Sequence, residues 1–86
     1  MTVRVKCFAI ARDLAGFAER SFELTQDATA GEALATIVAQ FPALAVHANR
    51  LALAVNLEYV DRSHVLRDGD ELALIPPVSG GALVTS

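Results

Sequence analysis

The sequence predicts an α+β protein in which a mixed sheet carries one main helix packed on one of its faces. Several short stretches alternate apolar and polar residues, as half-buried strands do, and the first runs from Val3 to Ala9. One stretch, from Thr29 to Phe41, instead spaces its apolar residues as a helix does. With 86 residues, 53% of them apolar, the chain is long enough for one core but too short for a second layer of helices.

The N-terminal part predicts two strands joined by a short helix. In the first strand, alternate side chains face the expected core, namely Val3, Val5 and Cys7, while Arg4, Lys6 and Phe8 face the other way. We expect a short helix from Ala9 to Leu14, with Gly16 as its C-cap. The stretch from Arg20 to Leu24 alternates again, with Phe22 and Leu24 inward, and predicts a second strand paired with the first.

The main helix has clear start and stop signals. Thr29 and Glu32 match a capping box, in which each side chain accepts a hydrogen bond from the backbone N–H of the other residue. A single apolar stripe follows at helical spacing, made of Leu34, Ile37, Val38 and Phe41. Pro42 ends the helix because it cannot donate a backbone hydrogen bond. The stripe therefore packs on the sheet, and residues 42–50 form a connector with some helical character.

The C-terminal part predicts three more strands. Leu51 to Val55 forms a third strand, and Asn56 follows, which tolerates the left-handed backbone region and so permits a sharp turn into a short edge strand, Glu58 to Val60. After a loop, Asp68-Gly69 signals a tight turn. Glu71 to Ile75 is the last strand, with Leu72 and Leu74 inward and Ala73 and Ile75 outward.

This order of elements is that of the β-grasp, or ubiquitin-like, fold. In that arrangement the first and last strands are adjacent and parallel in the centre of the sheet. Phe8 and Ile75 then lie near each other on the face that no helix covers. A shared apolar site on that face suggests a docking patch for a partner; the alternative is two scattered exposed hydrophobic residues, which are common on protein surfaces.

The last strand leads into a slim tail, residues 76–81, with the sequence Pro-Pro-Val-Ser-Gly-Gly. Pro76 and Pro77 end the strand because neither donates to a sheet ladder. Gly80 and Gly81 have no side chains, so they fit a narrow channel. The functional interpretation is a tail that delivers the Gly81 carboxyl group into another protein's active site; the alternative is an ordinary frayed terminus.

Composition excludes several classes of function. The net charge of −3 gives no basic surface for nucleic acid, and no apolar run approaches the roughly 20 residues of a membrane span. The single cysteine, Cys7, excludes an internal disulfide and a multi-cysteine metal site, and it is more simply a buried hydrophobe than a nucleophile. His47 and His64 lack a second ligand at metal spacing, so we expect no metal site. We expect a cytoplasmic protein that is not an enzyme on its own.

Three stretches resemble a known family, the small subunits of molybdopterin synthase, which are ubiquitin-like sulfur carriers. They are Val5 to Gly16, the turn at Asn56 with Glu58 to Val60, and above all Leu66 to Gly81, with Asp-Gly-Asp-Glu and Pro-Pro-Val-Ser-Gly-Gly. The resemblance covers residues 3–81. It divides the chain into a sulfur-carrier domain, residues 1–81, and an extension, residues 82–86.

The resemblance implies a function and a set of partners. Gly81, once C-terminal, is adenylated by an E1-like adenylyltransferase that uses ATP and Mg²⁺, and a sulfur donor then converts it to a thiocarboxylate. The large synthase subunit, in an expected heterotetramer, uses this sulfur to convert cyclic pyranopterin monophosphate into the molybdopterin dithiolene. This chain itself binds no cofactor. The partner-binding residues implied by position are Phe8, Arg12, Ile75, Pro76, Pro77, Val78, Ser79 and Gly80; for Arg12 the alternative is a solvated helix residue.

Two features depart from the family pattern. Leu57 stands where many relatives have Gly, and we expect a slightly different turn with no functional effect. Ala82 follows Gly81, so the Gly81 carbonyl lies in a peptide bond and cannot be adenylated as written. Three alternatives stay open: a sulfur carrier for thiamine, tRNA thiolation or cysteine synthesis; an interaction module blocked by the extension; and, least favoured by the residues, a free-standing enzyme.

Overall fold

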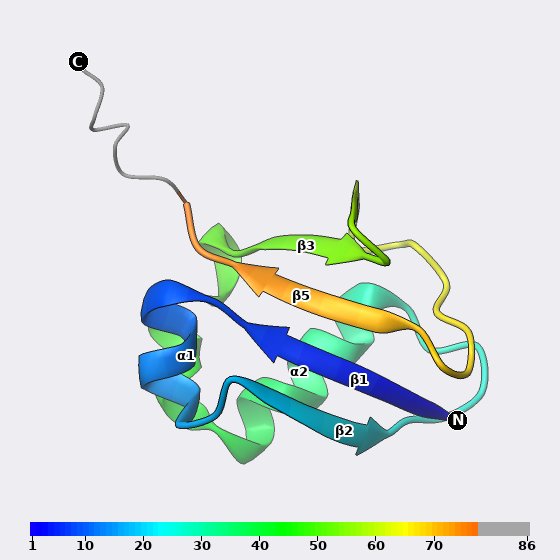
Figure 1. Cartoon of the computed structure of the whole chain (residues 1–86), viewed down its shortest axis with the longest axis horizontal. Helices are drawn as coiled ribbons and strands as arrows, with labels where there is room; N and C mark the ends of the chain where they lie inside the picture. The colour runs from blue at the N-terminus through cyan, green and yellow to red at the C-terminus, as the bar shows by residue number, and fades with distance from the viewer. Residues whose placement is uncertain (78–86) are drawn as a thin grey trace.

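The computed structural model describes residues 1–77, which form one sheet with its helices on one side (Figure 1). The elements, in chain order, are β1 (Thr2–Cys7), α1 (Ala9–Ala15), β2 (Glu19–Glu23), α2 (Ala30–Gln40), the 3₁₀ helices η1 (Pro42–Val46) and η2 (Ala48–Arg50), β3 (Ala52–Val55), β4 (Glu58–Val60) and β5 (Glu71–Ile75). Each predicted strand and helix is present, and the helical character expected of residues 42–50 is confirmed.

The sheet has the order β2-β1-β5-β3-β4, with β1 and β5 parallel and the other neighbours antiparallel. Val5 lies opposite Leu72, and Cys7 lies opposite Leu74. The prediction of a mixed β-grasp sheet with its first and last strands in the centre is therefore confirmed. Because β5 has a strand on each side, its position is fixed by two ladders of backbone hydrogen bonds.

The core lies between the inner face of the sheet and α2, which runs behind β1 and β5 in Figure 1. The predicted inward positions are buried: Val3, Val5, Leu72 and Leu74 on the central strands, and Ile37 on α2, are all 0% exposed. Burying a side chain of this size stabilises the fold by roughly 1.5–3 kcal/mol. The inward-facing apolar side chains of the strands and the apolar stripe of α2 thus pack against each other in one core.

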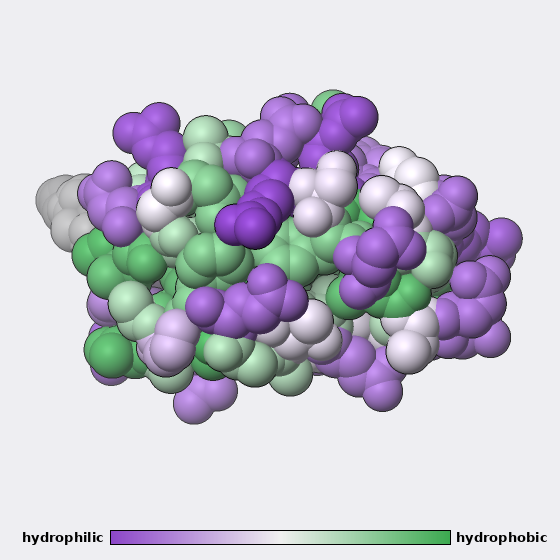
Figure 2. Space-filling model, turned by 90° about the horizontal axis from the view of Figure 1, so that it is seen from below, coloured by the Kyte–Doolittle hydropathy of each residue, from purple (hydrophilic) through white to green (hydrophobic). Residues whose placement is uncertain are grey.

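Partly buried aromatic side chains extend this core toward its edge. The Phe17 and Phe41 ring centroids are 5.1 Å apart, and the Arg20 guanidinium carbon lies 5.5 Å from the Phe41 centroid. Figure 2, which views the molecule from below Figure 1, shows apolar surface between hydrophilic side chains. The rings of Phe17 and Phe41 thus pack against the edge of the core and cover it there.

The ends of the helices follow the local signals in the sequence. The Thr29 hydroxyl accepts from the Glu32 backbone N–H at 3.1 Å, and the Glu32 carboxylate accepts from the Thr29 N–H at 2.8 Å, so the capping box is confirmed. Gly16 caps α1 with a φ of +84°, and Pro42 opens η1 one residue after the α2 C-cap. Among the described residues, no helix is long and apolar enough to cross a membrane.

The first strand is shorter than predicted. It ends at Cys7 because Phe8 is the N-cap of α1, with an extended backbone, φ −119° and ψ 150°. The Phe8 N–H still donates to the Leu74 carbonyl at 3.3 Å, which ties the strand end to β5. Phe8 therefore keeps the outward direction expected of a strand residue although it lies at the start of a helix.

Candidate functional site

The tail begins at the end of the central strand. Leu72 and Leu74 hold β5 in the core, and Ile75 is followed by a half-buried Pro76 and an exposed Pro77. The point from which the tail leaves is therefore fixed relative to the sheet. The other predicted tail contacts, Val78, Ser79, Gly80 and Gly81, and the extension lie outside the described residues.

The face of the sheet opposite α2, here called the outer face, carries an apolar hollow of about 170 Å³. We call it the outer-face groove; it is lined by Phe8, Ala54, Leu57, Tyr59, Glu71, Ala73 and Ile75. The prediction that Phe8 and Ile75 lie together on the bare face is confirmed, and Phe8 is 46% exposed. The two residues thus belong to one surface and are not scattered.

The register of the sheet explains why a groove forms there. Ala54 of β3 lies directly opposite Ala73 of β5, so two methyl groups occupy the middle of the outer face. Ala54 also lies opposite Tyr59 of the edge strand β4. Small side chains between large ones leave a hollow, since opposite residues of paired strands are neighbours on one face.

Sequence reasoning missed Leu57 and Tyr59 as members of this surface. Tyr59 is 74% exposed and Leu57 is 91% exposed, and both line the groove. The direction of Tyr59 follows from the sheet: Val60 pairs with the buried Leu53, so its neighbour Tyr59 points outward. Nothing in the sequence pattern alone indicated Leu57, which lies in a turn.

Two ion pairs lie on the sheet, and one of them includes Glu71, the carboxylate that lines the groove. Lys6 Nζ lies 3.1 Å from Glu71 Oε2, and Arg4 Nε lies 3.0 Å from Glu19 Oε2. Such partly exposed pairs add little stability, about 0–1 kcal/mol each. Their effect here is on recognition, since the carboxylate that lines the groove already has a cationic partner.

Cys7 is a core residue, as the sequence indicated. It is 3% exposed, and burial raises the pKa of its thiol to about 11. The thiolate is the reactive form, so this side chain is inert near neutral pH. Among residues 1–77, no group of three or more His, Cys, Asp and Glu side chains is placed to hold a metal ion.

Arg12 lies exposed on α1. Its carbonyl accepts the Gly16 N–H at 2.9 Å and so takes part in the cap of that helix. Its side chain does not line the outer-face groove. A role for Arg12 in a partner interface stays a prediction.

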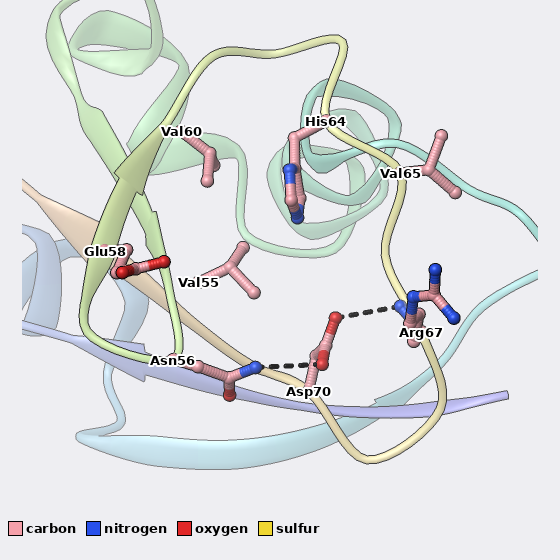
Figure 3. Close-up of a pocket in the computed structure, with 8 residues that line it drawn as sticks. All are labelled: Val55, Asn56, Glu58, Val60, His64, Val65, Arg67 and Asp70. Carbon is pink, nitrogen blue, oxygen red and sulfur yellow. Dashed lines mark hydrogen bonds between the residues drawn. The ribbon is translucent and has the colours of Figure 1, made fainter.

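A second hollow, of about 390 Å³, lies where β5 begins, at the other end of that strand from the tail (Figure 3). Asp70 lies at its centre and accepts hydrogen bonds from the Asn56 side-chain amide at 3.0 Å and from the Arg67 backbone N–H at 2.8 Å. The bond from Asn56 joins the β3–β4 turn to the turn before β5, and the bond from Arg67 closes the latter turn. The polar groups of this hollow therefore hold two turns together.

The fold and the sequence of the tail together define a class: β-grasp proteins whose central last strand leads into a segment that contains Gly-Gly. Residues 5–81 match the family model described as the ThiS family, and the chain belongs to that family. The match ends at Gly81 and so includes the whole tail.

Curated relatives match almost the whole chain. The molybdopterin synthase sulfur carrier subunit of Chlamydomonas reinhardtii is 43% identical over 83 residues, which cover 94% of this chain and 100% of the relative. The protein of the same name from Arabidopsis thaliana is 37% identical over 79 residues, covering 92% of this chain and 82% of the relative. The family resemblance found in the sequence is thereby confirmed.

Solved structures agree in fold. SAMP1 from Haloferax volcanii superposes with a TM-score of 0.82 at 32% identity, covering 94% of this chain and 100% of that one. A putative molybdopterin converting factor subunit 1 from Pyrococcus furiosus gives 0.82 at 30%, covering 91% and 99%. A chain in the complex of subunits 1 and 2 of molybdopterin-converting factor from Helicobacter pylori gives 0.67 at 25%, covering 91% and 96%.

Proposed function

We propose that this chain is the sulfur carrier and small subunit of a molybdopterin synthase. Gly81, as a C-terminal thiocarboxylate, donates sulfur to cyclic pyranopterin monophosphate to form the molybdopterin dithiolene. The observation that carries the proposal is the similarity to relatives bearing that name, 43% identical over nearly the whole chain. The position of the tail at the end of a fixed central strand supports it.

The chemistry divides between this chain and its partners. A carboxylate is a poor electrophile, so an E1-like enzyme, using ATP and Mg²⁺, first converts the Gly81 carboxylate to an acyl-adenylate. Sulfur at the oxidation level of sulfide, supplied by a sulfur donor, then attacks the acyl carbon and displaces AMP, which is a good leaving group, so that the thiocarboxylate forms. The acid–base groups of the transfer belong to the large subunit; this chain supplies the sulfur atom, the reach of the tail and a docking surface.

The outer-face groove is the proposed docking surface for the large subunit and for the activating enzyme. Phe8 and Ile75 line it beside the start of the tail, so a protein that holds the tail also lies next to the groove. A neighbour of similar fold is part of a complex of subunits 1 and 2, which supports a large-subunit partner. Exposed contiguous apolar surface of this kind is typical of interaction sites.

The extension must be removed for this function. Adenylation needs a free carboxyl group on Gly81, and in the sequence that carbonyl is bonded to Ala82. We infer that a protease cleaves the bond between Gly81 and Ala82. The junction has small residues, which suit binding in an extended form.

Two measurements test the proposal together. The intact mass of the protein from its host shows whether residues 82–86 are present, and adenylation is assayed on the 86-residue chain and on a chain ending at Gly81. We expect AMP transfer to the shorter chain only, followed by conversion of precursor once sulfur is loaded. If neither chain is adenylated, the carrier function is wrong and a non-activated interaction module replaces it.

The likeness to SAMP1 from Haloferax volcanii, which is also named small archaeal modifier protein 1, favours a second candidate, a protein modifier. In that case the activated Gly81 forms an amide bond with an amine of another protein instead of receiving sulfur. Both candidates share the activation step, so adenylation does not separate them. Conjugates that carry this chain in the host, together with failure of the sulfur-loaded chain to convert precursor, would favour the modifier.

A further inference from the structure

The β3–β4 turn holds a large apolar residue in a backbone conformation that suits glycine. Asn56 has a φ of +50° and Leu57 a φ of +74°. Two consecutive positive φ values are those of a type I′ hairpin turn, in which Asn, Asp and Gly predominate. Asn56 fits that preference, whereas a bulky side chain at such a φ is an uncommon, strained choice.

Strand pairing and the contacts of Asn56, and not contacts of Leu57, impose this conformation. The Asn56 side-chain amide donates to Asp70 Oδ1 at 3.0 Å (Figure 3), and its carbonyl oxygen accepts from the Glu71 N–H at 3.1 Å. The Asn56 backbone N–H donates to the Glu71 carbonyl at 2.9 Å. These bonds fix the turn against β5. Because Val55 pairs with Glu58, residues 56 and 57 form a two-residue hairpin loop, and such a loop requires the positive φ that Leu57 adopts.

Within residues 1–77, the Leu57 side chain buries little surface that could offset this strain. Its side chain is 91% exposed, the most exposed of the large hydrophobic residues that the structure describes. Strain of this kind persists where surrounding structure imposes it, and it is concentrated at functional sites. The strained residue also has a defined place, because it lines the outer-face groove together with Phe8, Tyr59 and Ile75.

Leu57 lies at the end of the groove away from the tail. Val55, two residues before it, pairs with Leu72, whereas Ala52 pairs with Ile75. Leu72 and Ile75 are three steps apart along β5, which is roughly 10 Å at about 3.3 Å per residue. A partner that contacts both Leu57 and Ile75 must therefore cover the length of β5 on the outer face.

We propose that Leu57 is a binding contact for the large subunit that receives the tail. This inference rests on the proposed function and replaces the expectation that Leu57 has no functional effect. The occupant is an apolar protein surface, because the groove is lined mainly by apolar side chains and its one carboxylate, Glu71, is already paired with Lys6. The strained turn then presents a leucine side chain to the partner at the far end of the groove.

The experiment compares Leu57→Asn and Leu57→Gly with the native chain, each ending at Gly81 so that the tail is free. Truncation there keeps all the described residues. Both substitutions suit a positive φ, so the midpoint of thermal unfolding stays the same or rises. Affinity for the large subunit, measured by calorimetric titration, falls about tenfold, which is about 1.4 kcal/mol.

A matched control is Val46→Asn. Val46 is also a large exposed apolar residue, at 80%, but it lies in η1 and does not line the groove. The affinity of the Val46→Asn variant for the large subunit stays within twofold of that of the native chain. A leucine with only a structural role would show the reverse pattern, a lower unfolding midpoint with unchanged affinity.

Three results overturn the inference. If both Leu57 variants bind the large subunit with the affinity of the native chain, Leu57 is not a binding contact, while the proposed function still holds. A native chain that dimerises, with dimerisation lost in Leu57→Asn, assigns the groove to a second copy instead. A native chain that binds no large subunit at all overturns the proposed function as well, so the two failures are distinguishable.

Discussion

Replacing Ile75 by Asp tests the docking surface directly. Ile75 is half-buried on the outer face beside the start of the tail. Full burial of such a side chain is worth roughly 1.5–3 kcal/mol, and about half of that remains to be gained when a partner covers it. Asp loses this gain and adds the cost of dehydrating a carboxylate at the interface. Ile75→Asp should therefore weaken binding of the large subunit at least tenfold, which is about 1.4 kcal/mol.

The assay is a titration of the variant against the large subunit, alongside a denaturation curve. Because about half of the Ile75 burial is already made within this chain, the free energy of unfolding should fall by roughly 1–2 kcal/mol through lost burial and strand propensity, which leaves the variant folded. Val46→Asp is the control, since Val46 is 80% exposed and does not line the groove. If Ile75→Asp binds as tightly as Val46→Asp, the outer-face groove is not the docking surface.

Three further predictions concern the tail, the packing and the core thiol. Gly80→Val, in a chain ending at Gly81, should leave the free energy of unfolding unchanged but stop sulfur transfer, because a β-branched side chain widens the tail and restricts its backbone. If this variant converts precursor at the normal rate, the tail does not enter a narrow channel in the partner. Gly31→Ala should lower the free energy of unfolding in urea by about 1–3 kcal/mol, because the added methyl carbon would lie 3.0 Å from the Cβ atom of Arg62 and 3.1 Å from its carbonyl oxygen. An unchanged unfolding midpoint would contradict this steric conflict. Burial raises the pKa of the Cys7 thiol to about 11 from 9.0, so the unfolded chain ionises first and the free energy of unfolding should fall as the pH rises from about 9 to 11. The Cys7→Ala variant should lack this contribution to the pH dependence of stability. Equal pH dependence in the two proteins would contradict the raised pKa of Cys7.

Local signals predicted the fold well because each is read over a few residues. The capping box at Thr29, the C-cap at Gly16 and the stop at Pro42 all appear where the sequence placed them. Alternation in the strands predicted which side chains are buried, since a strand has only two faces. The boundary of β1 was less accurate, because Phe8 continues the alternation while its backbone already caps a helix.

The candidate site was only partly predictable. Phe8 and Ile75 were found because strand parity and the β-grasp order together place them on one face. Tyr59 was missed because its direction follows from the pairing of β4 with β3, which is a property of the sheet and not of β4 alone. Whether Phe8, Arg12, Ile75 and the tail residues from Pro76 to Gly80 contact a partner stays a prediction.

The sequence by itself determined the order of the elements, the two core-facing surfaces and the family, because these depend on residue type and spacing along the chain. Only the tertiary structure decided that Ala54 and Ala73 meet to form the floor of a groove, since their opposition depends on the register between strands far apart in sequence. It also decided the conformation of Leu57. The pairing of Val55 with Glu58 closes a two-residue loop, and hydrogen bonds between Asn56 and the start of β5 hold that loop in place. The loop requires a positive φ at a residue whose own preference opposes it, so the strain arises from strand pairing and not from residue type.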